Sequence, residues 1–341
     1  MFQLGPAAAV VAALAITPAP GPFPEDDSDH SVAAVAIFFG DSLSMGLLPG
    51  AAPNAPGVNP VLNDPTIQAN GAWVESNNTR YDDPPNPDFM AGMAPSQPWY
   101  PVDDTQGVNF VSASPVFGFA TQIRATIDQN KAEQPDEIFC IQLGIGSSHA
   151  ALDAMGNNSP FSWNPGAVTT SNGMNGYDSI AMFDMLVDFH VRTSVNNLLA
   201  NFDEVQLIGV FGSCGGAYIQ GSANVNWLAQ YEGHMNDIRE GFGALFNLSP
   251  TETDSFPMGL FLWHDANTMT FPQVLQNKLR IVQNQWANKG GENDFLAKLN
   301  LVNGLTPDGV HFTESTSISA GVHWVFALEA HWNPVPITSI N

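Results

Sequence analysis

Short apolar runs alternate with longer amphipathic segments along most of the chain. Residues 31–39 (SVAAVAIFF) form a continuous apolar run, which is typical of a buried parallel strand. Similar runs, the last of them weaker, follow at 137–143, 205–211, 258–263 and 299–302. Apolar residues at helical spacing separate or follow these runs at 116–129, 177–201, 227–246, 271–288 and 318–332. Strands that alternate with helices predict an α/β protein with a mostly parallel five-stranded sheet, covered by helices on both faces.

Two segments do not follow this alternation. Residues 49–109 are rich in Pro, Asn, Gly and Asp, and predict a long loop packed over the domain. Residues 5–16 are apolar but too few to cross a bilayer, which takes about 20 residues. They have the length of a secretory leader without its basic residues, and an arm docked on this protein or on an assembly partner explains them equally well. We expect an arm or leader with an acidic linker at 1–30, and one domain at 31–341.

The chain is acidic because it lacks cations. It has 9 Lys and Arg against 33 Asp and Glu, a net charge of −24, and 12% charged residues in all, where about 25% is usual. Such a surface repels phosphate backbones and anionic lipids, which argues against nucleic-acid binding and membrane anchoring. The 2 cysteines exclude a disulfide scaffold and a cysteine zinc site. We expect Cys140 and Cys214 to remain separate thiols, with Cys140 buried in its strand.

A serine follows the first predicted strand. Ser42 stands in Gly40-Asp41-Ser42-Leu43, and in a parallel sheet the working residues come directly after the strands. Ser42 is therefore a candidate nucleophile, although a serine before a helix also serves as a structural N-cap.

An acid and a histidine stand three residues apart near the other end of the chain. Asp308 and His311 lie in a predicted loop before the last helix. A carboxylate at this spacing can orient the imidazole, while the other ring nitrogen accepts a proton from a serine hydroxyl. The alternative is an Asp that caps a turn beside an unrelated histidine. The two loops together favour a Ser-His-Asp triad.

These motifs carry a family resemblance. With Gly40-Asp41-Ser42-Leu43 and Asp308-Gly309-Val310-His311, the chain resembles the SGNH (GDSL) hydrolase superfamily, serine esterases with a flavodoxin-like three-layer α/β/α fold. Its middle resembles the sialate O-acetylesterase type of carbohydrate esterase. The cues there are residues 115–120, 141–147, 209–211, Tyr231 and Arg239.

The resemblance implies roles for individual residues. Ser42 would be the nucleophile, and its N–H, with that of Gly146 or Ser147, would bind the oxyanion. The family carries a further polar donor where this chain has Ser213-Cys214-Gly215-Gly216. Either Ser213 or a backbone N–H, such as that of Gly215, substitutes for it, or the oxyanion hole is weakened.

The resemblance favours one activity over two alternatives. We expect a carbohydrate O-acetylesterase that needs no metal and no cofactor, with an O-acetylated carbohydrate as substrate, acting outside the cell or on a virion surface. One alternative is a general GDSL lipase or esterase, because Asp41-Ser42-Leu43 follows the general form of the superfamily. The other is a non-catalytic structural or receptor-binding component of a virion or surface assembly, docked through residues 1–30.

Overall fold

Three long strands of buried residues form the centre of the sheet. In a computed structural model, β1 (Val32–Gly40) lies between β4 (Glu137–Ile145) and β7 (Glu204–Ser213), parallel to both. β1 is buried from its second residue onward, as expected for a strand covered on both faces. The structure describes residues 30–41, 66–74, 99–101, 115–130, 135–145, 150, 161–167, 180–181, 183–213, 229–263, 273–299, 305 and 311–341.

The sheet extends on both sides of these strands. Its order is β3-β2-β4-β1-β7-β8-β9, and β10 pairs with β7. Neighbours from β2 to β9 are parallel, whereas β3 and β10 pair in the antiparallel sense. The added strands are β2 (Ile67–Val74), β3 (Tyr100–Pro101), β8 (Met258–Phe261), β9 (Asp294–Ala297) and β10 (Val335–Pro336). A separate parallel pair consists of β5 (Phe161–Ser162) and β6 (Ile180–Ala181).

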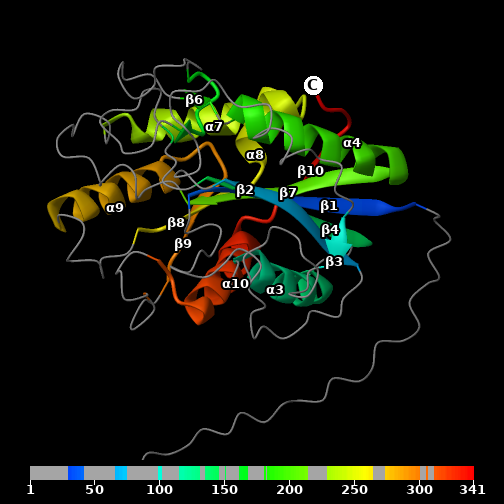
Figure 1. Ribbon diagram of the computed structural model, residues 1–341, viewed down its shortest axis with the longest axis horizontal. Coiled ribbons are helices and arrows are strands. Elements are labelled where there is room, and N and C mark those ends of the chain that lie inside the picture. The colour runs from blue at the N-terminus through cyan, green and yellow to red at the C-terminus, as the bar shows by residue number, and fades with distance from the viewer. Residues whose placement is uncertain are drawn as a thin grey trace, which may run out of the picture. The chain divides into compact units, whose positions relative to one another are not determined.

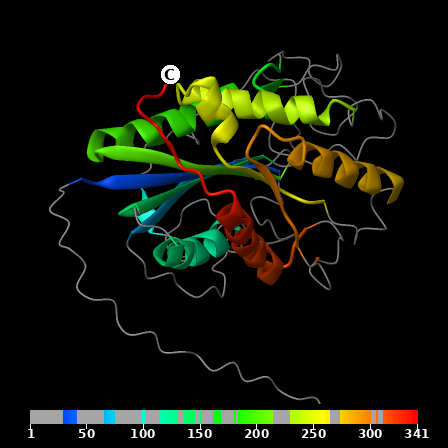
Figure 2. The same cartoon turned by 180° about the vertical axis from the view of Figure 1, so that it is seen from behind.

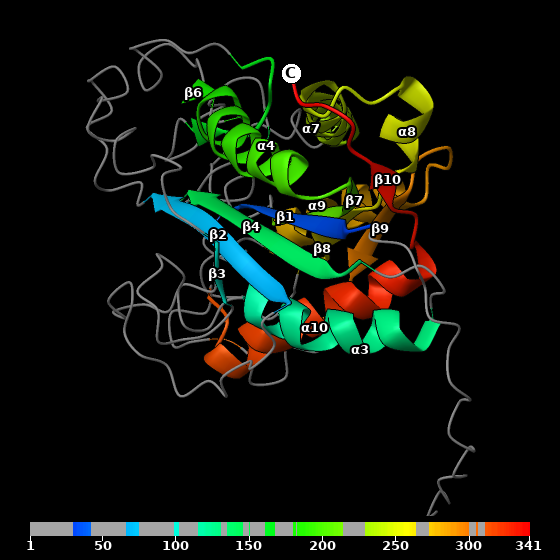
Figure 3. The ribbon, with the colours of Figure 1, turned by 90° about the vertical axis from the view of Figure 1, so that its right-hand side faces the viewer.

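Helices cover both faces of the sheet, which confirms the predicted α/β class (Figure 1). One face carries α3 (Pro115–Asn130) and α10 (Glu314–Ala330), and α4 (Arg192–Asn201) and α7 (Tyr231–Leu245) lie on the other, as Figure 3 shows end-on. The remaining helices are η2 (Phe183–Val191), α8 (Pro250–Ser255) and α9 (Gln273–Ala287). Of the described helices, none is long and apolar enough to cross a membrane.

Adjacent phenylalanines of β1 pack against the two helical layers. Phe38 contacts Phe119 of α3 at 5.0 Å and Trp324 of α10 at 5.5 Å between ring centroids. Phe39 faces the other side, where it contacts Trp163 and Phe242 of α7 at 5.7 and 6.0 Å. Side chains alternate along a strand, so two neighbouring aromatic residues anchor both layers.

Several predicted elements need correction. The sheet has eight strands rather than five, and residues 49–109 are not all loop, because β2 pairs with β4 over eight residues. Asn70 and Gly71 weaken the strand signal of β2, and pairing with β4 overrides it. A strand not predicted, β9, lies just before the predicted fifth strand and begins with a buried Asp294. The predicted strand itself, at 299–302, lies almost wholly outside the described residues.

Two further differences concern helices. The helix predicted at 177–201 is α4 preceded by the π-helical η2, with β6 before it. One helix, α8, was not predicted; it is short, and Ser249 starts it with a capping box to Glu252. Six residues are too few for an apolar period to show.

The C-terminal segment crosses the amino edge of the sheet from α10 to α7, which is visible as the red trace in Figure 2. Val335 and Pro336 pair with β7, and the Ile337 N–H donates to the Val205 carbonyl oxygen at 2.7 Å. The Asn341 N–H donates to the Leu245 carbonyl oxygen at 2.9 Å. The segment therefore occupies the part of β7 that β8 does not reach.

Candidate active site

The end of β1 lies tightly against the end of β7. Gly40 pairs in register with Ser213, and the Asp41 N–H then donates to the Ser213 carbonyl oxygen at 3.1 Å. Gly40 has a φ of 130°, and a Cβ there would overlap the Ser213 carbonyl oxygen and lie 2.9 Å from the Ser213 nitrogen. Glycine alone adopts this conformation without strain. The approach fixes the point from which the chain continues into Ser42.

Four strand ends lie in one row at the carboxyl edge of the sheet. Gly144 of β4 and Ser213 of β7 are the register partners of Gly40 on its two sides. Phe261 of β8 comes one residue after the last β7–β8 pair, Gly212 with Leu260, and so continues the row. Neighbouring strands are about 4.8 Å apart. The two residues that follow β4 are predicted oxyanion donors, so they start from a strand next to the one that leads to the nucleophile.

The predicted general base comes to the same edge. Phe312 forms an antiparallel bridge with Leu305 and packs edge-on against Phe261, with 6.0 Å between ring centroids and 88° between ring planes. Phe312 is 3% exposed, whereas the preceding residue, His311, is half-buried. Phe261 is two strands from Gly40, or about 10 Å. The bridge closes the loop that contains the predicted acid.

The structure describes two of the predicted site residues, Ser213 and His311. Ser213 is 5% exposed, and its carbonyl oxygen is occupied by the Asp41 N–H. The other predicted residues lie outside the described part: Ser42, Gly146, Ser147, Gly215 and Asp308.

Two buried polar side chains at this edge had no role in the sequence analysis. Asp41 is 4% exposed and Gln142, in β4, is fully buried. Burying such groups is costly unless they are hydrogen-bonded. The available signal was a glutamine inside the apolar run 137–143.

Two tryptophans from irregular segments pack in or against the core. Trp163 is fully buried against Phe39. Trp99 packs edge-on against Phe139 at 4.7 Å, and its Nε1 donates to Asn197 Oδ1 at 3.3 Å. Trp163 is thus a core residue, and the partly buried ring of Trp99 packs against the core.

A buried charge cluster lies at the opposite, amino edge of β9. Arg239 of α7 is 1% exposed and donates to Asp294 at 2.6 Å. It also donates to the carbonyl oxygens of Thr253 and Phe256, at 2.7 and 2.8 Å. Burial outweighs the contact with Arg239 and raises the pKa of Asp294. Arg239 is therefore committed to structure, although it lies in a segment that carries the family resemblance.

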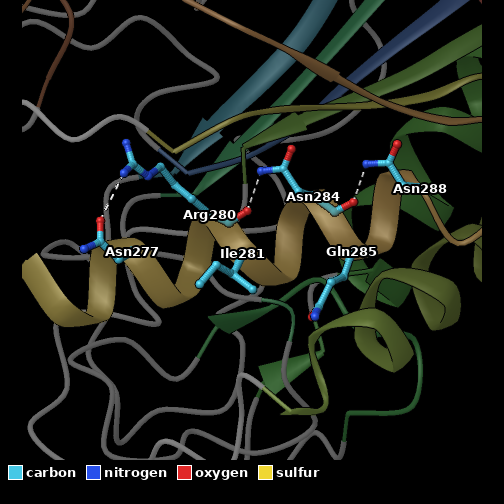
Figure 4. A pocket seen from close by; sticks show the side chains of 6 residues that line it. All are labelled: Asn277, Arg280, Ile281, Asn284, Gln285 and Asn288. Carbon is cyan, nitrogen blue, oxygen red and sulfur yellow. Dashed lines mark hydrogen bonds between the residues drawn. The ribbon is translucent and has the colours of Figure 1, made fainter.

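The outer face of α9 borders a surface groove of about 860 Å³ (Figure 4). Four of its polar side chains are bonded within the helix: Arg280 donates to Asn277 Oδ1 at 3.0 Å, and the Asn284 and Asn288 amides donate to carbonyl oxygens one turn back, at 2.7 and 2.6 Å. Ile281 stands among them, 56% exposed. Of the described residues, Gly40, Ser213 and His311 do not line this groove. Among the described residues, no group of three or more His, Cys, Asp or Glu is placed so that it could hold a metal ion.

Comparisons with known proteins give one weak likeness. No protein-family model matches the chain, and no curated protein matches it. A carbohydrate acetylesterase from Xanthomonas citri is among the solved structures that match, with a TM-score of 0.48 and 13% identity. The match covers 84% of this chain and 54% of that protein, so the chain spans about half the length of the protein that it matches. A likeness this low says nothing about activity.

Proposed function

We propose that the protein is a serine esterase that removes acetyl groups from a carbohydrate. The observation that carries the proposal is the meeting of segments at one edge of the sheet. Gly40 and Asp41 are held against Ser213, and Phe312 packs on Phe261 in the same row. Ser42 and His311 are far apart in the sequence, but each is next in the chain to a residue held at this edge, Asp41 and Phe312 respectively.

The reaction follows from the proposed roles. The Ser42 hydroxyl oxygen attacks the ester carbonyl carbon while its proton passes to His311, whose imidazole is oriented by Asp308. His311 then gives this proton to the sugar oxygen as the carbon–oxygen bond breaks. Water, deprotonated by His311, attacks the acetyl-enzyme, and acetate leaves as Ser42 takes the proton back.

The oxyanion needs preorganised donors on the side of the carbonyl away from the base. The Ser42 N–H and an N–H of Gly146 or Ser147 are the proposed pair, with Ser213 or the Gly215 N–H as a third. Each donor is worth about 2.7–4 kcal/mol, so the lack of one would slow turnover by about 100- to 1,000-fold without abolishing it.

Covalent labelling tests the nucleophile. A fluorophosphonate should label the wild type, and Ser42→Ala should lose both the label and the hydrolysis of p-nitrophenyl acetate. Ser44→Ala is the matched control, because it removes a serine two residues further along. Hydrolysis by Ser42→Ala at the wild-type rate would refute the assignment. A wild type that takes no label would refute the triad and favour the non-catalytic alternative.

Acetate release from O-acetylated glycans, compared with hydrolysis of longer acyl esters, tests the substrate class. Preference for the longer acyl chains would reassign the protein to the general lipases and esterases.

A further inference from the structure

A buried glutamine of α9 is bound to the backbone at the end of β8. Gln283 is 1% exposed, its Oε1 accepts from the Trp263 N–H at 2.8 Å, and its Nε2 donates to the Phe261 carbonyl oxygen at 3.1 Å. The same Nε2 lies 3.4 Å from the Tyr231 hydroxyl. One amide thus bonds to Phe261, the last residue of β8, and to Trp263, two residues further on, in the way that a neighbouring strand would.

The amide lies on the side of β8 that faces β7. Along a parallel strand, alternate residues bond to alternate neighbours. The Pro257 carbonyl oxygen binds Val210 of β7, and the Leu262 N–H binds Ala297 of β9. The backbone groups of Phe261 and Trp263 therefore point towards β7, which ends at Ser213. Gln283 thus bonds to β8 where a continuation of β7 beyond Ser213 would otherwise do so. The proposed third oxyanion donor, Ser213 or Gly215, lies in this part of the chain.

The end of β8 in turn packs against the histidine loop, the segment 305–312 that contains His311. The Phe261 ring stacks on Trp324 at 3.8 Å and 16°, and Phe312 packs edge-on against it. Phe312 directly follows His311 and is bridged to Leu305. A shift of the Phe261 backbone would move the ring on which the histidine loop rests.

We infer that Gln283 is a positioning residue of the proposed esterase. By fixing Phe261 and Trp263, it holds His311, through Phe312, at the distance from Ser42 that proton transfer requires. The inference rests on the proposed function and adds a residue that contacts neither the substrate nor the reacting atoms. A misplacement of about 1 Å can cost a factor of about 100 in rate.

The test removes the amide and keeps the side-chain volume. Gln283→Met should slow fluorophosphonate labelling about 10- to 100-fold. In steady state it should lower kcat for p-nitrophenyl acetate and leave KM nearly unchanged. Leu279→Ala is the matched control, because Leu279 is fully buried on the same helix. It should lower the melting temperature at least as much as Gln283→Met while leaving the labelling rate of the folded protein at the wild-type value.

A double-mutant cycle tests the route. If Gln283 acts through Phe312, the loss of rate in Gln283→Met and Phe312→Leu together should be less than the product of the two single losses. Wild-type labelling by Gln283→Met, a loss shared equally by Leu279→Ala, or independent effects in the cycle would each overturn the inference. A wild type that takes no label would overturn the proposed function as well, so the two failures are distinguishable.

Discussion

Replacing Gly40 with alanine tests the close approach at the centre of the site. Gly40 has a φ of 130° and lies with its Cα against the Ser213 backbone. An alanine must adopt a backbone conformation that is essentially reserved for glycine, and its methyl group must displace the Ser213 carbonyl group. That carbonyl group accepts the Asp41 N–H, so the change also disturbs the chain that leads into Ser42.

The expected loss has two parts. The unfavourable φ costs about 1–3 kcal/mol, and forcing a methyl group into a packed site costs about 1–3 kcal/mol more. A middle value of about 4 kcal/mol lowers the melting temperature by about 6 °C, because a domain of about 310 residues has an unfolding entropy of about 0.65 kcal/mol/K. The folded fraction of Gly40→Ala should also react more slowly with a fluorophosphonate, because Ser42 is displaced.

Two other glycines separate these effects in a calorimetric series. Gly290 has a φ of 78° with nothing within 4 Å of the position that a methyl group would take, so Gly290→Ala shows conformational strain alone. Gly233 is helical and equally open, and Gly233→Ala should stabilise the protein by about 0.5–1 kcal/mol. If Gly40→Ala loses no more stability than Gly290→Ala, the contact between β1 and the end of β7 is not as described.

Three further predictions concern buried charges, a histidine and a thiol. Arg239→Met removes the nearest cation from the buried Asp294 and leaves that carboxylate with Lys289, 3.4 Å away, so the free energy of unfolding in urea should fall by about 3–5 kcal/mol. Arg192→Met breaks a half-exposed pair and should cost less than about 1 kcal/mol. Equal losses would contradict the difference in burial. Burial lowers the pKa of His331 below the usual value, about 6.5, so the neutral form is favoured in the folded state. The neutral His331 side chain therefore contributes stability above about pH 6.5, and this contribution is lost as the pH falls through the pKa of the folded state. The melting temperature of His331→Gln should fall less steeply than that of the wild type between pH 7 and pH 5. Parallel curves would refute this. Burial also raises the pKa of the Cys140 thiol, a free cysteine, so Cys214→Ser should react with iodoacetamide only after unfolding, and rapid native labelling would show that Cys140 is accessible.

The central strands could be predicted because a strand buried on both faces has a continuous run of apolar residues in the sequence. Continuous apolar runs mark β1, β4 and β7 within a few residues of their ends. The predicted burial of Cys140 is confirmed, and so is its state as a free thiol. β2 and β9 could not be predicted in the same way. Asn70 interrupts the first, and the second begins with Asp294, a buried carboxylate that pairs with Arg239 of α7 and with Lys289.

The sequence predicts the edge of the sheet at which the candidate site lies, but not the side chains that hold its loops in place. A parallel sheet brings the ends of its strands to one edge, so the loops after β1, β4 and β7 had to be neighbours. The Gln283 contacts depend on a side chain reaching the backbone of a strand about twenty residues earlier, and no local pattern encodes that bond. A weaker signal was present, because Gln276 and Gln283 occupy the same helical face as Leu279 and Trp286. A polar residue at a core position invites a search for its partner.

The partners of the few Arg and Lys side chains bear on whether the substrate is neutral or anionic. The arginines that the structure describes are each engaged by the protein: Arg124 by the Pro135 carbonyl oxygen, and Arg192, Arg239 and Arg280 by side chains. An anionic sugar would need a cation near the carboxyl edge. Among the described residues, Lys298 follows a strand at this edge; it is exposed just after β9 and is three strands from β1, or about 14 Å. A neutral acetyl ester needs no such partner, since the donors of the oxyanion hole are backbone and hydroxyl groups. With a net charge of −24 repelling anions, we expect the proposed esterase to favour neutral acetylated sugars over acetylated sialosides.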